Sequence, residues 1–219
     1  MVLKIIILFC ILINFGCSSN SGTIIWSQTS NTGLATRIAI EKTFIYILSD
    51  DRSKYTRYGQ WHIEKRKSID GSHVSSFGNH GIVTGNDEDM GRSIDIAADS
   101  QYIYVIGDDN TPGNGDSQWR IEKRWASNGA LVDDFGDHGV VTNNPTPYID
   151  SPRAIAADAN FMYVLGFEEV LPGYLNPQSY RSDIRWRIEK RKLSDGSLAS
   201  DFGDGGHVTS NPNEIEGGA

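Results

Sequence analysis

The chain contains the stretch Trp61-His62-Ile63-Glu64-Lys65-Arg66 and repeats it, with one change, as Trp119-Arg120-Ile121-Glu122-Lys123-Arg124 and Trp186-Arg187-Ile188-Glu189-Lys190-Arg191. The second copy starts 58 residues after the first, and the third starts 67 residues after the second. Repetition of one pattern along a chain is typical of proteins that stack the same structural unit several times. The sequence therefore predicts three copies of one unit.

Turn-forming residues recur at a fixed spacing from the repeated stretch. The pairs Asp70-Gly71, Asn128-Gly129 and Asp195-Gly196 each begin nine residues after their Trp, and such pairs favour tight turns between antiparallel strands. Tyr163 lies 23 residues before its Trp, whereas Tyr104 lies 15 residues before its own. The third copy therefore has eight extra residues in this interval, and we expect them to form a surface loop.

The repeated stretch alternates as a β-strand does, with Trp119, Ile121 and Lys123 on one face of the second copy and Arg120, Glu122 and Arg124 on the other. Residues 102–106, just upstream, are rich in β-branched and aromatic side chains, which favour strands. Residues 139–142 form a last short strand. Beyond the N-terminal segment, no stretch has a sustained helical period, so we expect an all-β protein of repeated antiparallel sheets.

Composition limits the class of protein. The 219 residues include 20 basic and 28 acidic side chains, and the formal net charge is −8. A sequence-independent nucleic-acid binder needs a basic surface, so this class is excluded. Only two Cys are present, which excludes a disulfide-rich scaffold.

The N-terminal segment predicts export. A charged start is followed by the apolar residues 5–13, a run shorter than the ~20 residues of a membrane-spanning helix. With Gly16 before Cys17, residues 1–17 resemble a bacterial lipoprotein signal peptide. This resemblance implies that Cys17 is acylated and that residues 18–219 are anchored at the cell envelope, on the outer membrane or the cell surface. The alternatives are an ordinary cleaved signal, which gives a secreted protein, and an uncleaved N-terminal anchor.

The unit resembles the delta-60 repeat family, a β-propeller repeat of bacterial secreted and surface proteins. The resemblance rests on Asp195-Gly196-Ser197-Leu198, on Asp201-Phe202-Gly203-Asp204-Gly205-Gly206-His207-Val208-Thr209, and on the upstream residues 153–158 and 161–166. It covers about residues 22–212 and implies a β-propeller-like array. The repeat units are then about 22–80, 81–138 and 139–205, with a partial fourth at 206–219. The family implies a fold and no catalytic residues.

The number of units leaves the architecture open. Propellers usually have 4–8 blades, and three units with one further strand do not readily close a ring. The chain is then a truncated relative of longer surface propeller proteins, half of a six-unit ring completed by a homodimer, or an open or three-fold arrangement.

Two groups of side chains are candidate binding residues. The long loop of the third unit breaks the repeat symmetry, and its Tyr174 and Tyr180 are aromatic anchors for a partner. Arg66, Arg124 and Arg191 form either a charged ring at a channel mouth or ion pairs within each sheet. The three repeated Trp residues favour packing between units over a sugar-binding surface.

Metal and cofactor signals are weak. Residues 108–115 read as a polar loop, and Asp108, Asp109 and the adjacent Asp116 have the oxygen ligands that Ca²⁺ accepts. The sequence favours a solvated turn over a calcium site here. The His residues match no zinc motif, and no nucleophile-elbow or phosphate-loop motif is present. No other cofactor is expected.

These features predict an exported, lipid-anchored repeat protein that acts as a non-catalytic binding or structural module at the cell envelope. Its partner is a protein or glycan at the cell surface, and it meets the membrane only through the N-terminal anchor. The alternatives are a propeller-type hydrolase or lyase with carboxylates at the ring mouth, and a fragment of a longer protein.

Overall fold

The computed structural model describes residues 34–51, 60–85, 90–171 and 183–210, and in this part the chain forms strands and no helix. The all-β prediction is confirmed for these residues. The strands are β1 (Leu34–Glu41), β2 (Phe44–Asp51), β3 (Gln60–Lys67), β4 (Ile82–Thr84), β5 (Met90–Ala98), β6 (Tyr102–Gly113), β7 (Asp116–Trp125), β8 (Val140–Asn143), β9 (Asp150–Ala157), β10 (Phe161–Leu171), β11 (Asp183–Lys192) and β12 (His207–Ser210).

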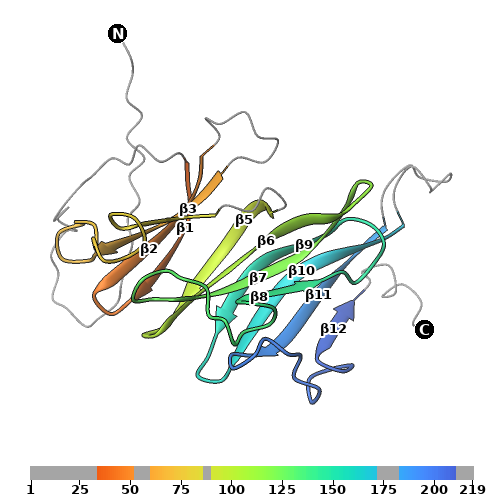
Figure 1. The fold of residues 1–219 in the computed structure, drawn as a ribbon. Helices are drawn as coiled ribbons and strands as arrows, with labels where there is room; N and C mark the ends of the chain where they lie inside the picture. Colours follow the sequence, from red (N-terminus) through yellow and green to blue (C-terminus); the bar gives the residue numbers. More distant parts are fainter. Residues whose placement is uncertain (1–33, 52–59, 86–89, 172–182, 211–219) are drawn as a thin grey trace, which may run out of the picture.

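The strands form three antiparallel sheets of four, and each sheet follows the chain order. The first sheet is β1-β2-β3-β4, the second is β5-β6-β7-β8 and the third is β9-β10-β11-β12. The sheets lie side by side in chain order from left to right in Figure 1. In the described residues, no helix is long and apolar enough to cross a membrane.

The sheets divide the chain one strand later than the predicted repeat units. The short strands β4, β8 and β12 lie at the start of the second, third and partial fourth units, yet each pairs with the strand that precedes it. Residues 206–210 therefore complete the third sheet rather than begin a fourth. The described chain consists of three complete four-stranded sheets.

The repeated stretch lies on the third strand of every sheet and gives the sheet two different faces. We call the face with its Trp, Ile and Lys the front face, and the face with its Arg and Glu the back face. Trp61 and Trp119 occupy equivalent positions, because each lies opposite an Asp of the second strand, Asp50 and Asp108. The expected alternation of the stretch is confirmed.

Two apolar cores lie between the sheets, and each joins a front face to the next back face. The first core contains Tyr46, Leu48, Trp61, Ile63, Phe77 and Val83 from the front of the first sheet and Ile96, Ile103, Val105 and Ala126 from the second. The second core contains Tyr104, Ile106, Trp119, Ile121, Val132 and Phe135 from the second sheet and Ile155, Met162 and Val164 from the third.

The same polar contacts close both interfaces. Lys65 Nζ donates to the Ala126 carbonyl at 2.7 Å, and Lys123 Nζ donates to the Leu193 carbonyl at 2.5 Å. Backbone N–H groups of Gly78 and Gly136 likewise donate to carbonyls of the next sheet, at 2.9 and 3.1 Å. The two interfaces therefore share these polar contacts at equivalent positions.

The Asn-Gly and Asp-Gly turns need glycine because they press against the preceding sheet. Gly129 has a φ of +80°, and a Cβ added there would lie 2.2 Å from Cγ2 of Val83. Gly196 repeats this at the second interface, where its Cβ would lie 2.5 Å from Cγ2 of Val141. These glycines allow both the left-handed backbone and the close approach of two sheets.

The predicted loop at residues 108–115 is mostly strand. β6 continues to Gly113 and returns through the two-residue turn Asn114-Gly115, which sits inside the pair Gly113 and Asp116. Both turn residues have positive φ, at +57° and +86°, as a tight hairpin turn with the strand twist requires. The sequence pattern Asn-Gly signals this hairpin, but the acidic residues before it suggested a loop.

The difference in burial between two equivalent Phe residues predicts different costs for their replacement by Ala. Phe135 is fully buried between the second and third sheets, whereas its equivalent Phe202 on the third sheet is only half-buried. We expect Phe135→Ala to lower the free energy of unfolding by about 3–5 kcal/mol. The loss caused by Phe202→Ala is expected to be smaller than this by about 1 kcal/mol or more. Urea unfolding of the two variants measures the difference, and equal costs would contradict the assigned packing.

Candidate functional site

Every back face buries a glutamate beside arginines of its own strand. Arg120 Nε and Arg124 Nε each donate to one oxygen of Glu122 at 2.9 Å, so this carboxylate is held from both sides. Arg187 and Arg191 hold Glu189 in the same way, at 2.6 and 2.7 Å. The alternation of the strand puts residues two apart on one face, which explains why Arg-x-Glu-x-Arg forms this arrangement.

The first sheet keeps half of this arrangement. Arg66 Nε donates to Glu64 Oε2 at 2.9 Å, and His62 stands where the other sheets have Arg120 and Arg187. His62 Nδ1 lies 3.0 Å from Thr84 Oγ1 on β4. Arg66 and Glu64 are both buried, so the first sheet also pairs these two charges within its own strand.

The predicted binding residues Arg66, Arg124 and Arg191 are buried within their own sheets and hold turns there. Each is buried, pairs with its own Glu, and donates from Nη1 to the carbonyl of the turn glycine five residues later, at 2.8–3.0 Å. They lie in three different sheets and point into their own strands and turns. This geometry corresponds to ion pairing within each sheet, along one strand, and not to a ring of exposed charge.

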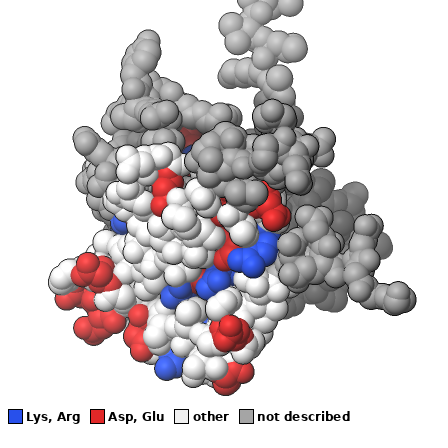
Figure 2. Space-filling view, turned by 90° about the vertical axis from the view of Figure 1, so that its right-hand side faces the viewer, with Lys and Arg blue, Asp and Glu red and all other residues white. Residues whose placement is uncertain are grey.

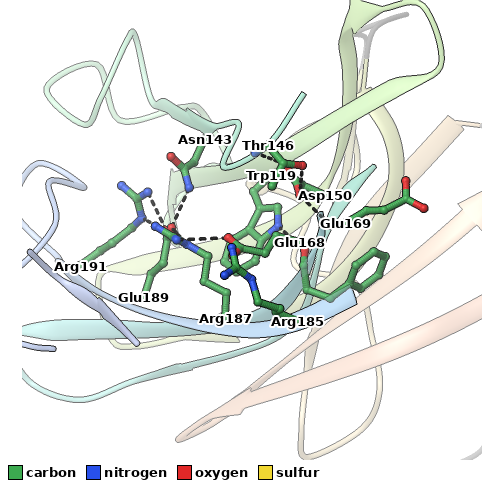
Figure 3. A network of polar contacts seen from close by, with 11 residues as sticks. Trp119, Asn143, Thr146, Asp150, Glu168, Glu169, Arg185, Arg187, Glu189 and Arg191 are labelled. Atoms are coloured by element: carbon green, nitrogen blue, oxygen red, sulfur yellow. Dashed lines mark hydrogen bonds and ion pairs between the residues drawn. The ribbon is translucent and has the colours of Figure 1, made fainter. Parts of the chain in front are cut away.

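At the third sheet the charged cluster extends into a network (Figure 3). Glu168 accepts from Arg187 Nη1 at 3.3 Å and pairs with Arg185 Nη2 at 2.6 Å. Asn143, from the last strand of the second sheet, donates to Glu189 Oε1 at 2.7 Å. The network thus ties the second and third sheets together through buried polar groups.

Asp150 is the member of this network that breaks the repeat, because Met90 occupies the corresponding place on β5. It is fully buried and accepts from the backbone and hydroxyl of Thr146, at 2.8 and 3.0 Å, and from the Glu169 backbone at 3.2 Å. Burial raises the pKa of its carboxyl to about 6, against the lowering effect of these hydrogen bonds. Asp150 is closed to solvent and fixes the connection between β8 and β9.

The carboxylates of the calcium hypothesis are not brought together. Asp108 accepts from Ser151 Oγ across the second interface, at 2.5 Å. Asp109 accepts from the Thr111 backbone, and Asp116 accepts from Asn144. Neighbouring strand residues point to opposite faces, which separates Asp108 from Asp109. Within the described residues no three metal-binding side chains gather closely enough to hold an ion.

Other predicted residues lie where the structure makes no statement. Tyr174 and Tyr180 of the third-unit loop are outside the described residues, and so is the predicted lipidation site Cys17. The predicted partner site of that loop therefore stays a prediction.

A hollow of about 300 Å³ opens between the first and second sheets. Ala126 lines it, whereas the larger equivalent Leu193 packs against the second core. Lys65 reaches into the hollow over the Phe44 ring, and burial lowers the pKa of its amine. Its remaining lining residues are Glu41, Tyr46, Ser100, Gln101, Trp125, Ala126 and Ser127.

The front face of the third sheet is exposed where the other two are covered. Trp186 is 41% exposed, against 3% for Trp61 and 0% for Trp119. The same contrast holds for Leu165 at 40%, whose equivalents Leu48 and Ile106 are at 0%. Figure 2, seen from the side on which the third sheet lies in Figure 1, shows a broad uncharged surface crossed by a band of basic and acidic side chains.

The sequence predicts packing between units for all three repeated Trp residues, and the structure shows this for Trp61 and Trp119 but not for Trp186. The repeat marks Trp186 as an equivalent of Trp61, but the burial of either depends on a neighbouring sheet. Comparisons with protein-family models, with curated proteins and with solved structures find no match to this chain. In the described residues, the front face of the third sheet and the hollow are the candidate binding surfaces.

The buried Asp150 predicts a pH dependence of stability. Its folded pKa of about 6 lies above the ordinary 3.8, so the folded protein keeps the proton that the unfolded chain loses. Stability from this group is present below about pH 4 and is lost as the pH rises to about 6. We expect a fall of at most about 3 kcal/mol in the free energy of unfolding.

The measurement is urea unfolding of the wild type and of Asp150→Asn at several pH values between 4 and 7. The difference between the two proteins isolates Asp150 from the exposed carboxylates. A difference that does not change with pH would contradict the assignment.

Proposed function

We propose that this chain is a non-catalytic binding or structural module of the cell envelope, built as an open β-propeller-like array of delta-60-type units. In this proposal the N-terminal segment directs export, and Cys17 carries the lipid anchor. The observation that carries the proposal is the open front face of the third sheet. It offers a partner the same kind of surface that holds the sheets of the chain together.

The energetics of this face support a docking role. Its exposed large side chains are Leu165, Ile184, Trp186 and Val208, at 36–49% exposure. A contiguous apolar surface on a protein in water marks a site of interaction with another molecule. Burial of such area stabilises an association by about 25 cal/mol per Å².

The charged groups support a non-catalytic role. The buried Glu and Arg of the three sheets satisfy one another, and Asp150, whose pKa is raised, has its oxygens occupied by Thr146 and Glu169. A general acid needs to reach the substrate. In this conformation Asp150 is enclosed.

Site-specific photo-crosslinking in the cells that produce the protein tests the proposal. A benzoylphenylalanine at Val208 lies on the open face, and the same residue at the exposed Ile69 lies in the turn after β3 of the first sheet. We expect position 208 to give a crosslinked product of higher mass in the envelope fraction and position 69 to give none.

The same samples are used to measure acylation of Cys17 and attachment of the protein to membranes. The N-terminal peptide of the mature chain is expected to carry acyl groups on Cys17, and Cys17→Ser is expected to release the protein from membranes. An absence of intermolecular product from position 208 in a correctly exported chain would contradict the proposed docking role.

A further inference from the structure

We infer that the front face of the third sheet docks a further four-stranded antiparallel sheet that carries the same back face as the second and third sheets. This inference rests on the proposed function and names the chemistry of the partner. The two interfaces within the chain show what such a front face binds.

The third sheet carries the donors of the other two front faces at the same positions. Lys190 Nζ lies 4.1 Å from the centre of the Phe161 ring, as Lys65 Nζ lies 4.0 Å from that of Phe44. Lys65 also donates to a carbonyl of the next sheet, whereas Lys190 pairs at 3.7 Å with Asp201 in the segment between β11 and β12. The amine is therefore placed for a carbonyl that the described chain does not supply.

A backbone N–H group also differs between the third sheet and the other two. Gly203 is the equivalent of Gly78 and Gly136, whose N–H groups donate to Asn128 and Asp195 of the following sheet. In the described residues the N–H of Gly203 has no such acceptor. Phe202 and Val208 beside it are the equivalents of the side chains on which Gly129 and Gly196 rest, so a turn with glycine fits here.

These contacts specify the partner. Its docking strand carries Arg-x-Glu-x-Arg, with the last Arg able to lie over Trp186 as Arg124 lies over Trp61, at 5.2 Å. An Asn-Gly or Asp-Gly turn follows, and its backbone carbonyls meet Lys190 and Gly203.

One position of the third sheet differs from the pattern. Phe167 stands where Asp50 and Asp108 accept hydrogen bonds from Ser93 and Ser151. The partner therefore presents an apolar side chain there instead of a serine. This makes the face selective among sheets that otherwise share the repeated back face.

An extended chain tests the inference directly. Residues 211–219 are replaced by a second copy of residues 86–143, joined to Ser210 as the natural copy is joined to Gly85. The copy carries Ser93→Ala, so that an apolar side chain meets Phe167 where Ser93 meets Asp50 in the natural chain. The copied second sheet supplies Arg120, Glu122, Arg124 and the Asn128-Gly129 turn. Hydrogen exchange is then followed at the Gly203 amide, whose peptide is unique in the extended chain.

We expect exchange at Gly203 to slow on the order of tenfold or more and to approach that of Gly136. Labelling of the Lys190 amine is expected to fall with it. The matched control carries Gly129→Asn in the copied sheet, because Asn tolerates positive φ but adds the Cβ that meets Val83 at 2.2 Å in the natural interface. In this control we expect Gly203 to exchange as fast as in the natural chain.

Unchanged exchange at Gly203 in the extended chain would overturn the inference, whether the copied sheet folds apart or stays unfolded. Slow exchange in both the extended chain and the Gly129→Asn control would also overturn it, because protection would then not depend on the turn contact. A crosslink from position 208 together with unchanged Gly203 exchange would leave the proposed docking role standing and reject this partner alone.

Discussion

The structure depends on the docking of a front face, with its Trp, Ile and Lys, onto a back face with its Arg and Glu. The front face is largely apolar, and the back face carries Glu and Arg side chains that pair along one strand. Docking removes apolar area from water and excludes solvent from the Glu–Arg pairs, where their attraction is stronger. The repeated strand contributes to both faces. Each added sheet therefore covers the front face of the sheet before it and exposes a front face of its own.

The buried ion pairs fix the geometry of the strand and its turn and add little net stability. Desolvation of Glu122 and Glu189 offsets much of their attraction to arginine, so such pairs add little net free energy. Each pair does, however, fix the orientation of an arginine whose Nη1 holds the next turn, at Gly129 and Gly196. The turn then places its glycine on the preceding sheet. Charge, turn and packing are thus linked within one strand.

The sequence predicts the parts of the fold that follow from local alternation. The six-residue stretch assigns Trp119 to one face and Glu122 to the other, and the structure agrees. The local sequence does not determine which strand pairs with β4. Its three residues lie between turns, and their pattern fits the edge of the preceding sheet as well as that of the following one. The environment of Asp150 and the hollow at Ala126 are also beyond local patterns, because each arises where two sheets meet and where one unit departs from the others.

The most direct test of the account is the solvent exposure of the repeated Trp residues in the intact protein. Incorporation of 5-fluorotryptophan gives a separate ¹⁹F resonance for each Trp, and the shift of each resonance between H₂O and D₂O reports its contact with water. The account predicts a small shift for Trp61 and Trp119 and a large one for Trp186, in line with exposures of 3%, 0% and 41%. Equal shifts for the three residues would show that the third front face is not open and would contradict the central claim.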